Sequence, residues 1–376
     1  MERPRNTTEE SQPGHLELGR KNRRDTLIVM AVTLALVLLA VVLVRVLNPG
    51  YSKRPYARQE YVLDDLVTIT AYGRNQAQVE GAVEDAFGEL SRLDGIADRY
   101  DPESELSRLN AAAASGPVEV SEELWEMIDI GMQAYEASGG LFDITVGPLI
   151  DVWDVTGRSE RGDPPPAQEE IEDALEKVGA DKLVLDPAAR TVAFAREGMA
   201  IDLGGVAKGY ALDKAASALR EGGVGTAIID MISTSLTMGE KPGGEGGNDW
   251  RIAVMDPRGE GYLATLLLDG DTYISTSGDY QRFFEYGGIR YHHILDPRTG
   301  YPAQGAISVT VLGGRNGAWS DAMSTAAFIM GYPQGMEWLR EMEQDGVMMV
   351  DGEGAVHVSP DLGEKVETIR ERAGGE

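Results

Sequence analysis

An uninterrupted apolar segment near the N-terminus constrains how this chain can fold. Residues 27–44 are eighteen uncharged residues, and Arg45 ends the run. A helix of this length is just long enough to cross the hydrocarbon core of a bilayer. We therefore expect one membrane-spanning helix over residues 26–47, which leaves the long remainder of the chain to fold in water.

The residues on either side of this segment predict its orientation. Basic side chains at 20–24 precede it in a polar tail over residues 1–25, so the positive-inside rule keeps that tail in the cytoplasm. A cleaved signal peptide is the alternative interpretation. No small-x-small cleavage site follows the apolar run, and the sequence therefore favours an uncleaved anchor.

The part that follows the apolar segment is strongly acidic. The whole chain has a formal net charge of −28, and residues 1–47 contribute seven basic and five acidic side chains. The remaining 27 basic and 57 acidic residues leave a net charge of −30. Such a surface repels a phosphate backbone, so nucleic acid is not expected as a partner. A phosphate-bearing ligand would need a local cation, either Lys, Arg or a metal ion.

The residues from 60 to 362 show a mixture of strand and helix patterns, after a linker over 48–59 and before an acidic tail over 363–376. Alternating or short apolar runs predict strands at 60–72, 182–186, 191–195, 224–231, 250–255, 262–268, 272–276, 306–312, 346–350 and 355–358. Helical spacing predicts helices at 75–98, 121–138, 168–178, 321–330 and 333–344, and a further one after residue 205. Three consecutive prolines predict a surface loop over 157–169. The Tyr-Gly-Gly sequence at 286–288 predicts the turn of a hairpin. The fold class is therefore mixed α/β (α+β). The absence of cysteine excludes disulfides, thiolate metal sites and a Cys nucleophile.

Asp321 and Thr325 lie four residues apart at the predicted start of a helix, so both side chains share one helical face. A carboxylate and a hydroxyl are oxygen ligands suited to Mg²⁺, which keeps positions open for phosphate oxygens and water. An aspartate near a helix start, with a threonine that bonds back to a carbonyl, would give the same pattern. The spacing alone leaves both interpretations open.

Two of the four histidines, His292 and His293, are adjacent in a segment that leads into a turn at Asp296-Pro297. Neighbouring side chains in a strand point to opposite faces, so at most one of the pair serves a site. Zinc is not expected, because the His, Asp and Glu residues show no zinc-ligand spacing. A hydrolase nucleophile is not expected at Ser277, which lacks the strand-turn-helix context.

The glycine pair Gly204-Gly205 leads into a helix that carries Lys208 in its first turn. Glycine-rich backbone at a helix N-terminus, together with a lysine, suits an anion. The spacing fits neither a P-loop nor a dinucleotide fingerprint, and a plain strand-turn-helix connection explains it equally well. Tyr100, taken alone, is interpreted as a packing or rim aromatic and not as a platform for a ligand.

Six segments in order along the chain together resemble the ApbE-type FAD:protein FMN transferases. They are 100–110 (YDPESELSRLN), 142–149 (FDITVGPL), 202–210 (DLGGVAKGY) with Asp213, 275–280 (STSGDY), 293–300 (HILDPRTG) and 321–325 (DAMST). The resemblance covers residues 60 to 360 approximately. It implies an ApbE-like fold of two intimately packed mixed α/β subdomains. It also implies cleavage of the FAD pyrophosphate, transfer of FMN to a Thr or Ser hydroxyl of a target protein, and release of AMP.

The resemblance also implies roles for individual residues. The implied Mg²⁺ ligands are Asp321, Thr325 and the main-chain carbonyl of Gly205, with Ser324 at a position where some members have a further carboxylate. Tyr100 is expected to pack on the flavin, and the other expected FAD contacts are Leu141, Phe142, Asp143, Asp202, Lys208 and His293. We expect His293 to orient or deprotonate the acceptor near the reacting phosphate, and Asp279 or Asp296 could share that task.

The chain departs from the family pattern at two places. The family's Gly-Gly-Asp turn after the strand at 226–231 is replaced by residues 230–236 (DMISTSL), which contain no glycine. The family's Met-Gly-Thr in the first strand is replaced by Leu63-Asp64-Asp65. The first change implies a rebuilt loop or a different hold on FAD, and reduced or altered activity can follow from either.

The resemblance and the apolar segment together predict a single-pass protein of the bacterial cell membrane with its catalytic domain outside the cytoplasm. There it would flavinylate electron-transfer subunits. The lipoprotein cysteine of many members is missing, so the helix over 26–47 would tether the domain. Two alternatives stay open: an FAD pyrophosphatase that uses water and gives FMN and AMP, and a non-catalytic membrane-anchored FAD-binding protein.

Overall fold

The computed structural model describes residues 55–369, apart from 244–248 and 343. The tail over 1–25, the predicted membrane helix over 26–47 and most of the linker over 48–59 lie outside the described residues. Among the helices of the described part, none combines the length and the apolar character needed to cross a bilayer.

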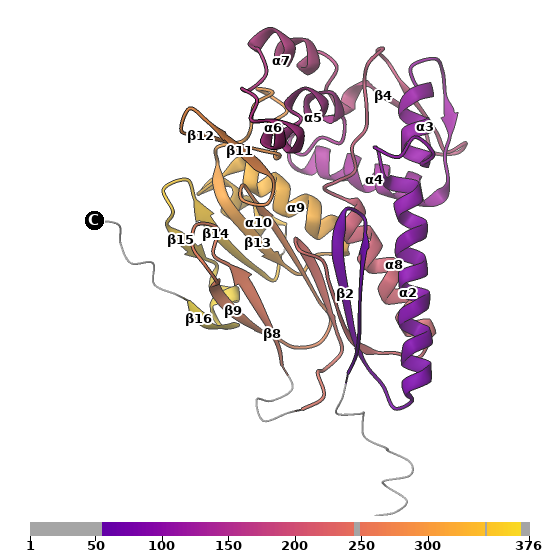
Figure 1. The fold of residues 1–376 in the computed structure, drawn as a ribbon, viewed down its shortest axis with the longest axis vertical. Helices are drawn as coiled ribbons and strands as arrows, with labels where there is room; N and C mark the ends of the chain where they lie inside the picture. Colours follow the sequence, from indigo (N-terminus) through magenta and orange to yellow (C-terminus); the bar gives the residue numbers. More distant parts are fainter. Residues whose placement is uncertain (1–54, 244–248, 343, 370–376) are drawn as a thin grey trace, which may run out of the picture. The chain divides into compact units, whose positions relative to one another are not determined.

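An eight-stranded sheet in which all neighbouring strands are antiparallel forms the centre of the fold (Figure 1). Its order is β1 (Tyr56–Val62), β2 (Asp65–Tyr72), β6 (Thr226–Asp230), β7 (Thr234–Met238), β10 (Thr272–Gly278), β13 (Ala306–Leu312), β14 (Gly346–Asp351) and β15 (Val356–Val358). Every residue of β7 and β13 is buried, because both faces of the sheet are covered.

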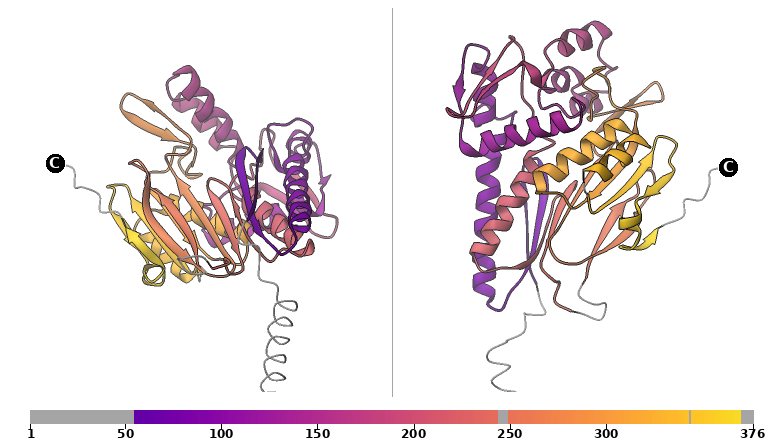
Figure 2. Two further views of the ribbon diagram at one scale, coloured as in Figure 1. Left: turned by 60° about the horizontal axis from the view of Figure 1, so that its bottom comes forward. Right: turned by 180° about the vertical axis from the view of Figure 1, so that it is seen from behind.

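Helices cover one face of this sheet. They are α2 (Gln76–Ala97), α4 (Glu122–Ala137), α8 (Ala207–Glu221), α9 (Gly317–Met330) and α10 (Gln334–Glu341). Seen from behind, α4, α8 and α9 lie in front of the sheet (Figure 2). The buried residues of α2 recur every three or four positions from Val79 to Leu93, which gives one apolar stripe. In contrast, α9 is buried almost all round, so its polar residues lie inside the protein.

A second, three-stranded sheet packs on the opposite face of the central sheet. It consists of β8 (Trp250–Met255), β9 (Tyr262–Leu268) and β16 (Val366–Ile369), and β9 is its central strand. Leu263 and Leu266 of β9 belong to the same apolar cluster as Ile274 and Leu312 of the central sheet. The short helix α11 (Pro360–Gly363) adds Leu362 to this cluster.

The remaining elements lie at the top of the view in Figure 1. They are α3 (Glu105–Ala112), α5 (Gly147–Trp153), α6 (Val155–Arg161), α7 (Gln168–Leu175), the 3-10 turn η1 (Ala180–Lys182), the sheet β3 (Val118–Glu119), β5 (Thr191–Phe194) and β4 (Leu183–Asp186), and the hairpin β11 (Phe283–Tyr286) with β12 (Ile289–His292). A separate apolar cluster around Trp153 joins α5, α7 and β11. The indole Nε1 of Trp153 donates to the carbonyl of Gly300 at 2.7 Å.

The strand predicted over 60–72 is wrong as a single element, because the chain reverses inside it. β1 and β2 form a hairpin whose two-residue turn is Leu63-Asp64, with φ of 56° and 55°. Leucine seldom adopts positive φ, so its presence hid a turn of the type that asparagine and glycine usually make.

Three further predictions need correction. The loop over 157–169 begins with helix α6, whose first turn is capped by the Asp154 side chain accepting from Gly157 N at 3.2 Å. The acidic tail over 363–376 contains β16, which pairs with β9. Strand β7 was not predicted, because its Thr and Ser residues give no apolar pattern. Inside the protein, however, Thr234 Oγ1 lies 2.9 Å from Ser275 Oγ.

The other predicted helices and strands are present within a few residues of their expected ends. The mixed α/β class is therefore confirmed. The described residues belong to one compact unit, and the central sheet runs through it from β1 to β15. The two intimately packed subdomains that the resemblance implied remain a prediction, because the contacts within the described residues do not divide them.

Candidate functional site

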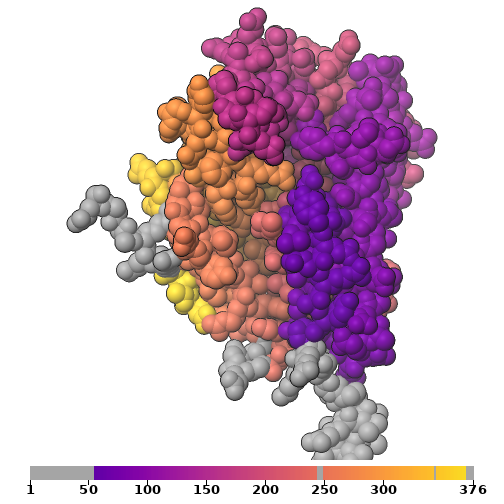
Figure 3. Space-filling model, in the orientation of Figure 1, coloured from indigo at the N-terminus to yellow at the C-terminus, as the bar shows by residue number. Residues whose placement is uncertain are grey.

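A cavity of about 260 Å³ brings together residues from distant parts of the sequence. Its lining comes from the β1–β2 turn, the end of α2, residues 141–146, the start of α8, the β6–β7 turn, the end of β10, residues 281–282 and 293–295, and α9. Figure 3 shows a hollow between the indigo N-terminal hairpin and the orange residues. Five of the six sequence segments that carry the family resemblance contribute at least two lining residues each, and the segment 100–110 contributes Tyr100.

Asp321 lines the cavity from α9. The sequence predicted Asp321 in the first turn of this helix. The helix instead begins at Gly317 after an Asn316 cap, so Asp321 lies in its second turn. One carboxylate oxygen accepts from Gly209 N at 2.9 Å. Burial raises the pKa of Asp321 to about 6, while the ammonium of Lys208 acts in the opposite direction.

The position of Asp321 depends on a very close approach of α8 and α9. A Cβ on Gly209 would lie 2.1 Å from the carbonyl oxygen of Gly317, and a Cβ on Gly317 would lie 2.3 Å from that of Gly209. Only glycine fits at either position, and the close packing lets Gly209 N reach the carboxylate. Asp213 also ties the two helices together, because it accepts from Gly317 N at 3.1 Å.

Thr325 lies one turn beyond Asp321 and also lines the cavity. Its Oγ1 is 3.1 Å from Ser277 Oγ, which is in turn 2.8 Å from Ser324 Oγ. Ser324 donates to the main-chain carbonyl of Asp321 at 2.9 Å and is buried. It is absent from the cavity lining, so the structure does not bring it to the position expected of a metal ligand.

Gly205 lies between Phe142 and Thr325. A Cβ at this position would be 2.8 Å from the Phe142 ring and 3.7 Å from Thr325 Oγ1. The cavity lining therefore includes the Asp321 carboxylate and the Thr325 hydroxyl, with the Gly205 backbone next to that hydroxyl. Such hard oxygen donors fit a Mg²⁺ ion that takes its other ligands from phosphate and water. Across the described ranges, no group of three or more His, Cys, Asp and Glu side chains could hold a metal by itself.

Lys208 is the cation whose charge acts on Asp321, and it forms an ion pair with Asp65. Its Nζ lies 2.9 Å from Asp65 Oδ2 and 3.1 Å from Ser233 Oγ, and its side chain lines the cavity. Ser233 belongs to the tight turn between β6 and β7, where Met231 and Thr234 exchange main-chain hydrogen bonds of 2.9 and 3.2 Å. The stretch without glycines therefore forms a turn with two central residues, Ile232 and Ser233.

The two histidines have different surroundings. His292 is buried, and its Nε2 donates to the carbonyl of Ala303 at 2.7 Å while Nδ1 accepts from Ile294 N at 3.2 Å. His293 lines the cavity, and its Nδ1 lies 3.2 Å from the carbonyl of Arg282. This contact places the proton on Nδ1 and leaves Nε2 as the acceptor. Burial, with the charges around it, lowers the pKa of His293 to about 3.

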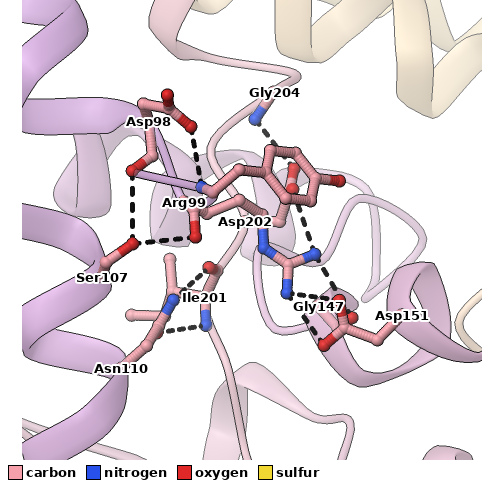
Figure 4. A network of polar contacts seen from close by, with 10 residues as sticks. Asp98, Arg99, Ser107, Asn110, Gly147, Asp151, Ile201, Asp202 and Gly204 are labelled. Carbon is pink, nitrogen blue, oxygen red and sulfur yellow. Dashed lines mark hydrogen bonds and ion pairs between the residues drawn. The ribbon is translucent and has the colours of Figure 1, made fainter. Parts of the chain in front are cut away.

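A polar network holds the residues next to Tyr100 (Figure 4). The guanidinium of Arg99 contacts both carboxylate oxygens of Asp151 at 2.9 and 3.0 Å and lies 3.7 Å from Asp202. Asn110 exchanges two hydrogen bonds with Ile201, at 2.8 and 2.9 Å, and Asp202 accepts from Gly204 N at 2.9 Å. The network fixes the backbone that leads into Gly205.

Tyr100 lies at the rim of this network and is 63% exposed. The Arg99 guanidinium is 5.2 Å from its ring centroid. A ring with an open face beside a cavity can stack on a planar ligand. Of the two positions that the residue alone suggested, packed or at a rim, this exposure agrees with the rim.

The stretch 141–143 lies beside residues 200–205, because Asp202 N donates to the carbonyl of Ile144 at 2.7 Å. Leu141, Phe142 and Asp143 all line the cavity. The carboxylate of Asp143 is occupied, since it accepts from Thr145 N at 2.7 Å, Thr145 Oγ1 at 2.6 Å and Ala180 N at 3.1 Å. Burial raises the pKa of Asp143, which these hydrogen bonds oppose.

The structure does not bring Asp279 or Asp296 to the cavity lining. Asp279 accepts from the Arg258 guanidinium at 2.7 Å and lies 3.7 Å from Arg290. Asp296 accepts from the Arg298 guanidinium at 2.8 Å. Both carboxylates are paired with arginines, which explains their positions without a catalytic role.

The sequence interpretation missed several lining residues, above all Arg99, Ser233 and Arg282, and it missed Asp65 behind Lys208. Arg99 directly precedes the segment 100–110, which carries part of the family resemblance, so its position could have been inferred. Asp65 lies 143 positions from Lys208 in sequence, and no local pattern could have paired them.

Comparisons with known proteins identify the family of this chain. The ApbE family model matches residues 63–350. The FAD:protein FMN transferase of Treponema pallidum is 31% identical over 332 residues, which cover 85% of this chain and 91% of that protein. The crystal structure of the ApbE protein of Thermotoga maritima superimposes with a TM-score of 0.76 at 31% identity, and covers 84% of this chain and 100% of that chain. A flavinyl transferase ApbE of Pseudomonas stutzeri, solved in its apo form, gives a TM-score of 0.70 at 28% identity, with coverage of 84% and 98%. This chain belongs to the ApbE family.

Proposed function

We propose that this protein transfers the FMN moiety of FAD to a Thr or Ser hydroxyl of a target protein and releases AMP. The observation that carries the proposal is the meeting of Lys208, His293 and Asp321 in one cavity with an exposed Tyr100 at its rim. A cation, a neutral imidazole, a buried carboxylate and an open aromatic face are the groups that a flavin pyrophosphate and its cleavage require. The names of the relatives support the same activity.

The flavin end of FAD would stack on Tyr100, with Leu141 and Phe142 as the apolar part of its site. Lys208 would neutralise the pyrophosphate, because it is the lysine of the cavity lining. Asp202 has one carboxylate oxygen bound to Gly204 N and lines the cavity, so it can accept from hydroxyls of the ligand. Asp143 acts through the backbone that it ties together and not through direct contact, since its oxygens are occupied.

Mg²⁺ would be held by Asp321, Thr325 and the main-chain carbonyl of Gly205. The fit rests on the hard oxygen donors that meet beside Lys208, and Ser324 is not part of the set because it is absent from the cavity lining. A bound Mg²⁺ ion supplies charge neutralisation to the pyrophosphate oxygens. Lys208 provides a second, permanent positive charge for the same group.

In the proposed reaction, the acceptor hydroxyl oxygen forms a bond to the FMN phosphorus, and the bond from that phosphorus to the bridging oxygen breaks. AMP leaves with the electron pair of the broken bond. The hydroxyl proton goes to Nε2 of His293, whose Nδ1 is held by the Arg282 carbonyl. The products are an FMN phosphodiester on the protein, AMP and one proton.

The experiment that tests the proposal uses the full chain, FAD, Mg²⁺ and an acceptor domain with an Asp-x-x-x-Thr segment. A fluorescent, covalently flavinylated acceptor after denaturing electrophoresis is the expected result, and Asp321→Asn should abolish it. If no fluorescent acceptor forms, or if Asp321→Asn leaves its yield unchanged, the proposed function is wrong.

We also propose that residues 26–47 anchor the protein in the bacterial cell membrane with residues 60–362 outside the cytoplasm. Support comes from the apolar run and the basic residues before it. The targets would then be extracytoplasmic electron-transfer subunits. Protease added to intact spheroplasts should degrade the folded domain. Complete protection, with degradation only after lysis, would contradict this location.

A further inference from the structure

Asp65 is a buried carboxylate directly behind the cationic wall of the cavity. It is 3% exposed and stands at the first position of β2, immediately after the Leu63-Asp64 turn. This is the place where Leu63-Asp64-Asp65 stands instead of the Met-Gly-Thr of the family pattern. Proteins rarely bury a carboxylate unless it is paired and hydrogen-bonded.

Both oxygens of Asp65 have partners. Oδ2 accepts from Lys208 Nζ at 2.9 Å. Oδ1 accepts from Leu66 N at 2.8 Å and from Ile232 N at 3.4 Å. The same Lys208 Nζ donates to Ser233 Oγ at 3.1 Å, and Ser233 lies in the β6–β7 turn.

The two departures from the family pattern therefore meet at one ammonium group. Asp65, at the start of β2, and Ser233, in the β6–β7 turn, both accept from Lys208 Nζ, and Ile232 N of the same turn donates to Asp65. Direct contacts thus join two segments that lie 167 positions apart in sequence.

The pairing changes what the cavity offers to an anion. The side chain of Lys208 is 18% exposed and that of Asp65 is 3% exposed, so solvent screens their attraction little. Asp202 and Asp321 add further carboxylates to the lining. The positive charge of Lys208 is thus balanced before any ligand arrives.

We propose that Asp65 is the internal counter-ion of Lys208: it fixes the ammonium at the cavity wall and weakens the attraction of the site for pyrophosphate. This inference rests on the proposed function in one respect, namely that Lys208 is the residue that binds the pyrophosphate. Asp65 is a positioning residue, since it acts on the ligand through Lys208.

The consequence for catalysis follows from the difference between ground-state and transition-state binding. FAD and its product AMP both carry phosphate charge, and an unbalanced lysine would bind both tightly without raising the rate of the chemical step. A lysine held by Asp65 and Ser233 needs no reorganisation when charge develops on the leaving phosphate. Asp65 therefore favours turnover over tight binding.

The test measures binding of ADP to the full chain by titration calorimetry, in EDTA so that only protein groups meet the pyrophosphate. Asp65→Asn should tighten ADP binding by roughly three- to tenfold, because it removes the counter-charge and keeps the shape. Asp64→Asn is the matched control: it removes one charge from the neighbouring residue, which is exposed and lines the same cavity. Its effect should be at least threefold smaller.

The second readout is the steady-state rate with FAD and acceptor. Asp65→Asn should lower both KM for FAD and kcat, because the freed ammonium follows the phosphate instead of being held. Asp65→Thr introduces the residue of the family pattern and should shift ADP affinity in the same direction. It also provides a variant if Asp65→Asn does not fold.

The proposal is overturned if folded Asp65→Asn or Asp65→Thr protein binds ADP no more tightly than the wild type. It is also overturned if Asp64→Asn gives the same gain, or if neither Asp65 variant folds, which would make Asp65 a structural residue. ADP binding needs no turnover. If the ADP affinities are as predicted but FMN transfer fails, the proposed function is contradicted and this inference about Asp65 is not.

Discussion

The chemistry that His293 can perform depends on which of its two ring nitrogens is already hydrogen-bonded. His293 has one ring nitrogen fixed by the Arg282 carbonyl, so the other nitrogen is the one that can take a proton. Its pKa of about 3 reflects burial and the positive charges of Arg282 and Lys208. A bound pyrophosphate brings negative charge to the same cavity and so raises this pKa. The imidazole would therefore become a stronger base when FAD is present.

Replacing His293 tests this role. His293→Gln should lower kcat for FMN transfer by about 10²- to 10⁴-fold, the usual contribution of a general base, with little change in FAD affinity. Asp279→Asn is the comparison, because Asp279 is paired with Arg258 outside the cavity lining. It should lower the thermal midpoint and keep kcat within a few-fold. A larger loss of kcat in Asp279→Asn than in His293→Gln would reverse the assignment.

His292 predicts a pH dependence of stability and not of catalysis. Burial lowers its pKa in the folded state below the ordinary value of 6.5. The unfolded state then binds the proton more readily, so the stabilisation is present above pH 6.5 and is lost as the pH falls toward the folded-state pKa. Between pH 7.5 and 5.0 the wild type should lose about 1 kcal/mol more unfolding free energy than His292→Gln. Urea unfolding of both proteins at the two pH values measures this. Equal losses would contradict it.

At the level of elements, the crossing of α8 and α9 places the site. Gly209 and Gly317 let the two helices touch, and Gly209 N then donates to Asp321. Asp213 accepts from Gly317 N at the same crossing, and from the Tyr273 hydroxyl at 2.6 Å. The helix start that carries Lys208 and the helix that carries Asp321 are thus fixed to each other.

Gly209→Ala tests this crossing. The added methyl group would meet the Gly317 carbonyl at 2.1 Å, so the helices must separate, which costs about 1–3 kcal/mol. We expect a lower thermal midpoint and a loss of FMN transfer. Gly81→Ala in α2 is the control, because Gly81 is exposed and has nothing within 4 Å of an added Cβ. That change should stabilise the protein by about 0.5–1 kcal/mol. Equal midpoints for the two variants would contradict the argument.

The elements also show what a sequence can predict. The spacing of apolar residues located most helices and strands, because periodicity depends only on neighbours along the chain. The Leu63-Asp64 turn was missed, since it uses a residue type that turns avoid. Strand β7 was missed because the partners of its buried hydroxyls come from β10 and from the turn before it, far away in sequence. Ten of the lining residues, among them Tyr100, Lys208 and Asp321, were predicted from the resemblance. The Asp65–Lys208 pair, in contrast, depends on the fold itself.

At the level of the whole molecule, a body with a charge of −30 has to attract a substrate with a dianionic pyrophosphate. The cavity lining contains several aspartates, and Lys208 is already paired. Protein cations alone therefore leave the pyrophosphate under-neutralised, and we expect the reaction to depend on a divalent cation.

Removal of metal tests that expectation. EDTA should reduce FMN transfer by at least about 10²-fold, the range lost when one strong electrostatic contact to a transition state is removed, and added Mg²⁺ should restore it. The unfolding midpoint without ligand should hardly change, because the described fold has no cluster of metal-binding side chains. Full activity in EDTA after extensive dialysis would rule out the proposed metal.

The stoichiometry of transfer tests the central claim most directly. Intact-mass spectrometry of the acceptor and chromatographic quantification of AMP should be followed in one reaction with FAD and Mg²⁺. We predict one AMP released for each FMN found on the acceptor, and almost no AMP when the acceptor is left out. Equal AMP and free FMN with and without the acceptor, and no mass gain on the acceptor, would instead identify the cavity as an FAD pyrophosphatase site.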